Sequence, residues 1–528
     1  MNRTLIGIAL LSLAAPLAVA QGLTHAGLLK QSPDTWPTYN GDYSGRRYSS
    51  LNQINAANVR ELSLAWTTRF TAEYGSVQIK ATPLLVNGVL YFSAPNSVWA
   101  ADAKTGRQLW HYQYPKNTGS TIGNRGVGMY GNWLYFESPD SHLISLDAKT
   151  GRERWKVEIA DPKLDYTSTA APIVVGDHIL VGIGGDHLDN PGFLESRDPE
   201  TGALQWRWWT TPRKGYPGIQ TWPSEQAAIH GTGQTWIPGT YDPELNLYYI
   251  GIGNPNPVLA GQGRKGDNLY TCSIVALNPD TGKMAWYFQV SPHDTHDWDA
   301  VQTPILIDGV IDGKPRKLLA QASRNGYFFL LDRTNGANIL TRPYIDTLNW
   351  SKGVNAKGQP IPDPVKEPRP DGVLVSPTSS GATNWPAPSF SPDTGLFYVA
   401  TVSGFSLYYM TDDDDFPVGW AGRDITVGSD GSALLAIDYK TGRIAWRHEW
   451  PGGGGPSHIL TTAGKLLFTH NQNYVIAFDP ADGKILWHAS LAAPPTAGPI
   501  TYMQDGTQYV LVAAGDSLYT FAVNRPVN

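Results

Sequence analysis

Short apolar runs, each ended by a turn-forming sequence, recur along the chain. In one example, Ile476-Ala477-Phe478 lies just before the turn residues Asp482-Gly483. Runs of this length and composition indicate half-buried β-strands. No stretch keeps the periodicity of an amphipathic helix long enough to build a helical domain. The pattern therefore predicts an all-β protein.

One pattern of strand, turn and tryptophan repeats. It consists of an apolar strand, an Asp or Asn, two residues, Thr-Gly or Asp-Gly, three more residues and a Trp. Complete copies occur at Asp102–Trp110, Asp147–Trp155, Asp198–Trp206, Asn278–Trp286, Asp438–Trp446 and Asp479–Trp487. The copy at Asp332–Gly336 keeps the turn and lacks the Trp, and Trp66 resembles the first Trp of the series.

The chemistry of this repeat predicts a propeller. Asp and Gly at these offsets form a tight turn in which Gly adopts positive φ, and each Trp can pack between neighbouring sheets. Most copies lie about 40 to 55 residues apart, which is the length of a four-stranded blade. The interval from Trp206 to Trp286 is longer because it contains an insertion rich in Gly, Pro and Trp. Seven turns, with a degenerate one between Gly336 and Gly442, predict an eight-bladed β-propeller with tryptophan-docking repeats. The alternative, a solenoid, would need capping repeats, and the sequence shows none.

The two ends of the chain have distinct roles. Ser517–Val523 is expected to complete the blade that the N-terminal region begins. Residues 1–20 have the pattern of a secretory signal peptide: Arg3, an apolar stretch from Leu5 to Leu17, and the small-residue site Ala18-Val19-Ala20. We expect cleavage after Ala20 and a single domain over residues 21–528. The apolar stretch is too short to cross a bilayer comfortably, so no membrane span is expected.

Composition narrows the classes of partner. The formal net charge is -6, and no basic patch suggests nucleic-acid binding. The single cysteine, Cys272, is expected to be a buried core thiol. One cysteine allows neither an internal disulfide nor a c-type haem, which needs two. Small molecules or proteins are therefore the expected partners.

The repeat resembles the tryptophan-docking motif of the pyrroloquinoline-quinone (PQQ)-dependent alcohol dehydrogenases. The resemblance covers nearly the whole mature chain and begins at Tyr39–Ser49. Its most specific part runs from Gly251-Ile252-Gly253-Asn254 through His296-Asp297-Trp298-Asp299 to Arg324-Asn325-Gly326 and Leu331-Asp332-Arg333-Thr334. A propeller without a cofactor, such as an outer-membrane assembly factor, should share the repeats and lack this block.

The resemblance implies roles for individual residues. Asn254 and Asp299 align with ligands of the active-site calcium, and Asp299 also aligns with the family's catalytic base. Arg324 aligns with the cation beside the reactive quinone carbonyl, and Trp236 with the indole under the quinone plane. Further contacts to the cofactor are implied for Arg125, Thr169, Gly185, Asn384 and Trp385.

Some positions depart from the family pattern. Gly119-Ser120 replaces a vicinal cysteine pair, and Lys80 replaces the Glu that lies near Arg125 in the family. The calcium-binding Glu falls at His187 in a gapless alignment and at Asp186 after a one-residue shift, so Asp186 is the candidate metal ligand and His187 the alternative. Val301 stands where lanthanide-using relatives carry a second Asp, which argues for calcium.

These residue types suit quinone-dependent oxidation of an alcohol. A hard divalent cation takes oxygen ligands and acts as a Lewis acid on a quinone carbonyl. A positioned carboxylate accepts the alcohol proton while hydride passes to the quinone carbon, and the cofactor supplies the redox chemistry.

Two polar clusters have plainer interpretations. The spacing of His293, Asp294, His296 and Asp297 matches no zinc pattern, so a shaped loop is expected, with Asp297 as a turn residue. Asp412–Asp415 lacks the spacing of an EF-hand loop and is expected to be a solvated surface run.

We therefore expect a periplasmic quinoprotein dehydrogenase that uses PQQ and Ca²⁺ to oxidise an alcohol, with a separate electron acceptor such as a periplasmic cytochrome c. Two alternatives stay open. One is a cofactor-free propeller that acts as a binding or assembly module, and the other is a quinoprotein acting on sugars or aldehydes.

Overall fold

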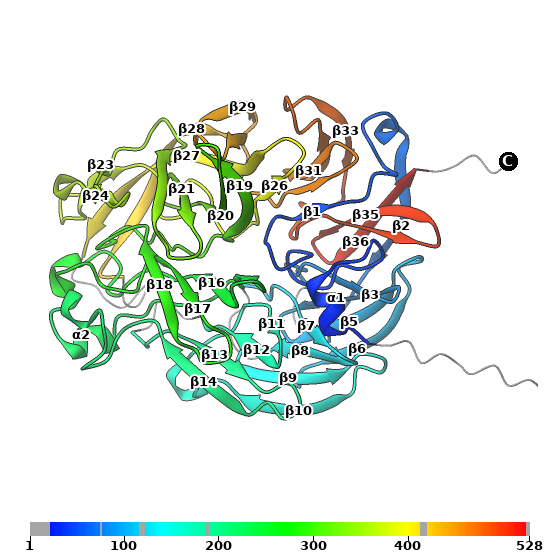
Figure 1. Cartoon of the computed structure of the whole chain (residues 1–528), viewed down its shortest axis with the longest axis horizontal. Helices are drawn as coiled ribbons and strands as arrows, with labels where there is room; N and C mark the ends of the chain where they lie inside the picture. The colour runs from blue at the N-terminus through cyan, green and yellow to red at the C-terminus, as the bar shows by residue number, and fades with distance from the viewer. Residues whose placement is uncertain (1–21, 74–76, 116–121, 185–188, 412–419, 524–528) are drawn as a thin grey trace, which may run out of the picture.

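The repeats of the sequence fold into sheets that follow one another around a ring. The computed structural model describes residues 22–73, 77–115, 122–184, 189–411 and 420–523. Within these ranges there are eight sheets of four or five strands and one two-stranded sheet. In Figure 1 the colour runs from blue through green to red once around this ring.

Five sheets are antiparallel meanders of four consecutive strands. They consist of β3 (Leu84–Val86), β4 (Val89–Ala94), β5 (Ser97–Asp102) and β6 (Gln108–Gln113); β7 (Gly128–Tyr130), β8 (Trp133–Glu137), β9 (His142–Asp147) and β10 (Glu153–Glu158); β11 (Ile173–Val175), β12 (His178–Val181), β13 (Phe193–Arg197) and β14 (Leu204–Trp209); β15 (Thr240–Asp242), β16 (Leu247–Gly251), β17 (Ser273–Leu277) and β18 (Met284–Gln289); and β19 (Ile305–Ile311), β20 (Lys314–Ala322), β21 (Tyr327–Asp332) and β22 (Asn338–Pro343).

The remaining sheets are less regular. One holds β25 (Val373–Val375), β26 (Ser389–Ser391), β27 (Leu396–Met410), β28 (Gly422–Asp438) and β29 (Ile444–Glu449); the next holds β30 (Leu460–Thr462), β31 (Leu466–Asn471), β32 (Tyr474–Phe478) and β33 (Ile485–Ser490), with β1 (Tyr48–Ser49) parallel to β30; and β23 (Ser351–Val354) pairs with β24 (Pro360–Pro362).

The last sheet joins the two ends of the described chain. It contains β34 (Ile500–Gln504), β35 (Thr507–Ala514) and β36 (Ser517–Val523), and β36 pairs antiparallel with β2 (Leu62–Arg69). The expectation that the final strand completes the N-terminal sheet is confirmed. This pairing closes the ring in Figure 1, where red β36 lies beside β2.

Helices are few and short in the described residues. The α-helices are α1 (His25–Leu29) and α2 (Glu225–Ile229), and the 3₁₀ turns are η1 (Val59–Glu61), η2 (Pro162–Leu164), η3 (Ile219–Thr221), η4 (Gly261–Arg264) and η5 (Pro364–Lys366). The all-β prediction is confirmed. None of these helices has the length and apolar character needed to cross a membrane.

Tryptophans of the repeat contact the turn of the following sheet. The indole N–H of Trp110, for example, donates to the backbone carbonyl of Ala148, beside the turn at Gly151. The same bond runs from Trp66, Trp206, Trp286, Trp446 and Trp487 to the carbonyls of Ala103, Pro279, Arg333, Pro480 and Leu62. Each contact ties one sheet to the next.

Because these tryptophans pack closely on the turn glycines, a side chain at a glycine position should lower the free energy of unfolding. Gly483 has φ +75°, and a Cβ atom there would lie 2.7 Å from the ring of Trp446. We expect Gly483→Ala to lower the free energy of unfolding by about 2 to 4 kcal/mol, combining left-handed backbone strain with overpacking. Gly313→Ala is the matched control, because Gly313 also has φ +75° but has open space around it. Equal losses in denaturant unfolding of the two variants would contradict a role for the tryptophan contact.

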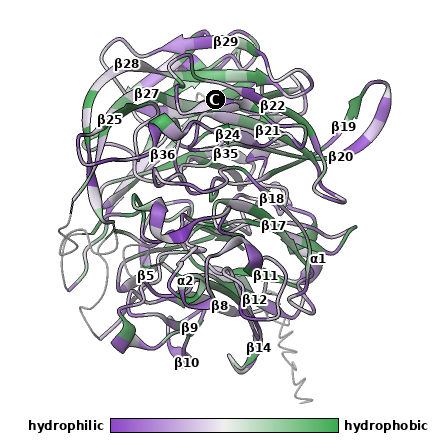
Figure 2. Cartoon of the chain, turned by 90° about the vertical axis from the view of Figure 1, so that its left-hand side faces the viewer, coloured by the Kyte–Doolittle hydropathy of each residue, from purple (hydrophilic) through white to green (hydrophobic). Residues whose placement is uncertain are grey.

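The β19–β20 hairpin extends beyond the ring and projects to the right of Figure 2. Its base is buried and its tip is exposed, with Val310 46% exposed.

Most apolar side chains lie between neighbouring sheets. Leu85 and Phe92, for example, pack in one core with Leu511. The core is therefore distributed around the ring.

The strand order decides which residues meet at the centre. First strands of neighbouring sheets pack together, as β7 does with β11 and β15 with β19. In an antiparallel sheet, the segment entering strand one and the connection between strands two and three lie at the same end. The Asp-x-x-Thr-Gly turns join strands three and four and lie at the other end. Polar residues from the first two kinds of segment therefore gather at one end of the ring axis.

Candidate active site

The predicted site residues come from segments at that end of the ring. Arg125 precedes β7, Thr169 precedes β11, Trp236 precedes β15, Asn254 follows β16, Asp299 precedes β19, Arg324 lies between β20 and β21, and Asn384 and Trp385 precede β26. Residues 185–188, which include Gly185, Asp186 and His187, lie outside the described residues, as does Gly119-Ser120.

Asp299 is the centre of a buried hydrogen-bonded cluster. It is 0% exposed, and its Oδ1 accepts from the Asn254 backbone N–H at 2.6 Å. Its Oδ2 accepts from Arg324 Nη1 at 2.6 Å and from the Trp236 indole at 3.1 Å. A Cβ atom at Gly253 would lie 3.0 Å from Oδ1, so the glycine lets the Asn254 backbone approach closely. The structure thus brings together Asn254, Trp236, Asp299 and Arg324.

Asp297 is a second carboxylate in this cluster. Its φ is +67°, which agrees with the predicted turn, but its side chain is also buried and its Oδ2 accepts from Arg324 Nη2 at 3.0 Å. Arg324 therefore bridges Asp297 and Asp299. Because Asp297 contacts the same cation as Asp299, the interpretation as a simple turn residue is incomplete.

The amide oxygen of Asn254 lacks a hydrogen-bond partner within the described part of the chain. Asn254 is 1% exposed, its Nδ2 donates to the Pro255 carbonyl, and its Oδ1 is buried and unpaired. An unsatisfied buried acceptor costs about 1 to 3 kcal/mol. A hard cation would satisfy it, since such ions prefer carboxylate and amide oxygens. The donor set of Asn254 and Asp299 therefore fits a metal ion.

Arg125 is a buried cation in contact with two indoles. Its guanidinium carbon lies 4.6 Å from the Trp236 ring centroid and 4.9 Å from that of Trp385. Nη1 donates to the Thr169 carbonyl at 3.0 Å, and the buried Nε has no partner among the described residues. Burial lowers the pKa of Arg125 to about 10. A buried cation that forms no ion pair within the described ranges fits a carboxylate-bearing ligand beside Trp236.

Asn384 supports this arrangement, whereas His293 and His296 bond to backbone carbonyls away from it. Asn384 Oδ1 accepts from the Trp385 N–H at 2.8 Å, and its Nδ2 donates to the Ser380 carbonyl, so it holds the segment that carries Trp385. His293 and His296 direct ring nitrogens to the carbonyls of Gly266 and Lys366.

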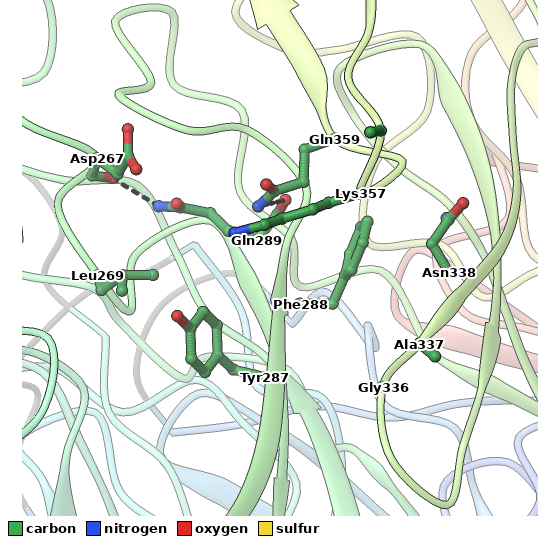
Figure 3. A pocket seen from close by; sticks show the side chains of 11 residues that line it. Asp267, Leu269, Tyr287, Phe288, Gln289, Gly336, Ala337, Asn338, Lys357 and Gln359 are labelled. Atoms are coloured by element: carbon green, nitrogen blue, oxygen red, sulfur yellow. Dashed lines mark hydrogen bonds between the residues drawn. The ribbon is translucent and has the colours of Figure 1, made fainter.

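A pocket outside this cluster lies between β18 and the β22–β24 region (Figure 3). Its volume is about 430 Å³. Gln289 donates to the Asp267 carbonyl at 2.6 Å at one side of it, and Gln359 donates to the Gln289 carbonyl at 3.3 Å. None of the predicted site residues lines this pocket, so it does not carry the candidate chemistry.

Comparison with known families decides what this cluster belongs to. Residues 36–366 match the family model "Glucose/ethanol/alcohol dehydrogenase, beta-propeller domain". The chain belongs to the PQQ-dependent alcohol dehydrogenases. It is 36% identical to the quinohemoprotein alcohol dehydrogenase ADH IIB of Pseudomonas putida, over 96% of this chain and 77% of the relative. It is 34% identical to the quinoprotein alcohol dehydrogenase PedH of Pseudomonas putida, over 97% of this chain and 92% of the relative.

Solved structures agree with this assignment. The quinohemoprotein alcohol dehydrogenase ADHIIG of Pseudomonas putida superposes with a TM-score of 0.87 at 32% identity, over 94% of this chain and 82% of that one. A europium-containing methanol dehydrogenase superposes with a TM-score of 0.84 at 30% identity, over 94% of this chain and 99% of that one. The enzyme is therefore a PQQ-dependent alcohol oxidoreductase with the propeller-type fold of that family.

Part of the chain also matches a propeller family of the cofactor-free kind. Residues 377–526 match the model of the outer membrane protein assembly factor BamB. A BamB structure from Moraxella catarrhalis superposes with a TM-score of 0.51 at 15% identity, over 87% of this chain and 99% of that one, which shows a shared fold and nothing more. The cluster around Asp299 lies outside this match and inside the dehydrogenase match.

Proposed function

We propose that this enzyme oxidises an alcohol at the cluster of Asp297, Asp299 and Arg324, with PQQ beside Trp236 and a metal ion on Asn254 and Asp299. The observation that carries the proposal is the Arg324 guanidinium, which bridges two buried carboxylates next to an unpaired amide oxygen and an indole. Bound PQQ would supply the hydride-accepting quinone carbon. The side chains of the cluster would bind the cofactor and the metal ion and accept the alcohol proton.

The cofactor contacts come from the residues around Trp236. Trp236 donates its N–H to Asp299, which fixes the plane of the indole. The Arg125 guanidinium lies over that ring and over the ring of Trp385, and it is anchored on the Thr169 carbonyl. We assign Trp236 to stacking against the quinone, and Arg125, Thr169, Asn384 and Trp385 to holding its polar substituents. Gly185 completes this proposed set.

The metal ion is proposed to be calcium, held by Asn254, Asp299 and Asp186. Val301 brings no second carboxylate to this ligand set, which favours calcium over a cation of higher charge. One relative, at 32% identity, is named a lanthanide-dependent methanol dehydrogenase. Calcium and a lanthanide are therefore the two ions to compare.

The two carboxylates differ in accessibility. Asp299, proposed from sequence as both ligand and base, accepts three hydrogen bonds, and its side chain is 1% exposed. Asp297 accepts from Arg324 and retains 11% exposure of its side chain, so a substrate can reach it more easily. We therefore propose a division of roles in which Asp299 binds the metal and Asp297 Oδ2 accepts the alcohol proton. Arg324 orients both carboxylates and would stabilise negative charge on the quinone carbonyl.

The architecture and cellular setting are part of the same proposal. We interpret the eight larger sheets as eight propeller blades in one domain, locked by the tryptophan contacts described above. We propose that residues 1–20 direct export to the periplasm. We also propose that the electrons leave to a separate acceptor such as cytochrome c; one relative, at 32% identity, is named 1-butanol dehydrogenase (cytochrome c).

A substrate panel tests the proposed reaction. The purified enzyme, loaded with PQQ and Ca²⁺, is assayed with an electron-accepting dye and primary alcohols, glucose or aldehydes. We expect the highest kcat/KM with an alcohol. Preference for glucose or an aldehyde would support the sugar or aldehyde alternative, and activity on none of them would support a binding module.

Trp236→Ala should weaken PQQ binding without unfolding the ring. Loss of stacking beyond area burial is worth about 0.5 to 1.5 kcal/mol, so the Kd should rise by at least about 2- to 13-fold. The Kd is measured by quenching of the remaining tryptophans, and thermal unfolding checks the fold. Trp66→Phe, which alters an indole in the outer part of the repeat, is the control. An unchanged Kd in Trp236→Ala would remove this residue from the cofactor site.

A further inference from the structure

Lys80 lies directly against the segment that carries Arg125. It stands just before β3, and its aliphatic chain packs on Gly123, where an added Cβ would lie 2.6 Å from Lys80 Cδ. Its Nζ donates to the backbone carbonyl of Ile122. The Thr82 N–H, two residues on, donates to the Arg125 carbonyl at 3.2 Å. Lys80 and Arg125 are thus held side by side by packing and backbone bonds.

The two cations lack a balancing acid in the described part of the chain. No ion pair there includes Lys80 or Arg125. Burial and the Arg125 charge both lower the pKa of Lys80, burial more strongly. The other buried polar groups near Arg125 are cationic or neutral: Arg47, the His458 imidazole and the Tyr39 hydroxyl, which is unpaired. Like charges in a buried site repel unless an anion joins them.

The neighbouring aromatic groups show where such an anion would belong. The Arg125 guanidinium lies over the rings of Trp236 and Trp385, beside the proposed position of the quinone. An acidic side chain at position 80, as the family pattern predicts, would neutralise Arg125 within the protein. Lysine leaves that charge available and adds another. The ligand must therefore bring the negative charge that the protein omits.

We propose that Lys80 and Arg125 form a two-cation site that binds a carboxylate of PQQ. This inference rests on the proposed function, because it places the quinone beside Trp236. It goes beyond that function by giving a role to a residue at which this chain departs from its family. PQQ carries three carboxylic acid groups, and one bound between two cations gains charge-assisted hydrogen bonds. Cofactor affinity should then depend on salt more steeply than with Arg125 alone.

The test measures PQQ binding by tryptophan fluorescence, without turnover. Loss of one charge-assisted hydrogen bond, worth about 1.5 to 3 kcal/mol, should raise the Kd of Lys80→Met by about 10- to 150-fold and reduce its salt dependence. Lys80→Arg should stay within about 3-fold of wild type, since it keeps the charge. Lys104→Met is the matched control: Lys104 pairs with Asp505 at an exposed site, at 2.7 Å, and its loss changes the net charge equally. We expect that variant to bind PQQ as wild type does.

A carboxylate-blocked ligand completes the test. PQQ trimethyl ester should bind wild type and Lys80→Met with similar Kd, because it offers no anion. A Lys80→Met variant with wild-type Kd and salt dependence for PQQ would overturn the inference, as would an equal loss of affinity for the ester. Failure of the proposed function gives a different result, namely that wild type does not bind PQQ or that Trp236→Ala binds it unchanged.

Discussion

Asp297→Asn should lower turnover with an alcohol by about 10² to 10⁴-fold while PQQ and the metal stay bound. The substitution keeps the side-chain volume and an oxygen that can still accept from Arg324, but it removes the basic carboxylate. Asp299 would keep its hydrogen bonds from Asn254, Trp236 and Arg324. The measurement pairs kcat with the absorption spectrum of the bound quinone and with metal content.

Asp299→Asn should behave differently from Asp297→Asn. Replacing a carboxylate ligand by an amide should reduce metal content and PQQ retention, with activity partly recovered at high metal concentration. Asp294→Asn is the control for a buried carboxylate in the same loop, because Asp294 accepts from the backbone N–H groups of His296 and Trp298 and not from Arg324. We expect Asp294→Asn to retain most of the turnover of the wild type. If Asp297→Asn turns over normally and Asp299→Asn keeps its metal but loses turnover, Asp299 alone has both roles.

Removing the metal should abolish activity. Chelation of the loaded enzyme is expected to lower dye-linked turnover by at least about 100-fold, since the Lewis acid contributes several kcal/mol to the transition state. Ca²⁺ should restore it, and the comparison with La³⁺ decides which ion the two-carboxylate cluster prefers. Asn254→Ala should raise the metal concentration needed for half-maximal recovery by at least about 10-fold.

The control for that experiment is the same substitution outside the candidate site. Asn335→Ala removes an amide from the exposed turn between β21 and β22, where Asn335 Oδ1 accepts from the Ala337 N–H at 2.9 Å. It should leave the metal requirement nearly unchanged. Full activity after exhaustive chelation, with metal content confirmed as zero, would show that the reaction does not use this ion.

Local chemistry explains why much of the fold was predictable. The Asp-x-x-Thr-Gly turn is stabilised within itself: Asp147 Oδ1 accepts from the backbone of Lys149 and Thr150 and from the Thr150 hydroxyl. Each tryptophan acts at a constant distance after that turn. Because both signals are short-range, the sequence shows them directly. The return of β36 to β2 is a long-range contact, and its prediction follows from closing the ring of repeats.

Asp297 shows what sequence alone does not reveal. Its partner Arg324 is 27 residues away, across the β19–β20 hairpin, so their contact exists only in the folded ring. The one local hint is the pair of carboxylates on either side of Trp298, both in a loop that enters a first strand. Asp297 and Asp299 share that position, so the hint applies equally to both carboxylates. Asp186 and His187 lie outside the described residues, so their assignment remains a prediction from alignment.

We propose that an alcohol reduces bound PQQ at the Asp299 cluster. The most direct measurement adds one equivalent of PQQ and excess Ca²⁺ to the purified enzyme, then titrates ethanol without air while the quinone spectrum and the aldehyde are followed. We expect full conversion of bound quinone to quinol with one aldehyde per PQQ, and no conversion in Asp297→Asn on the same timescale. Quinone that binds but is not reduced by any alcohol, or that Asp297→Asn reduces at the wild-type rate, would contradict it.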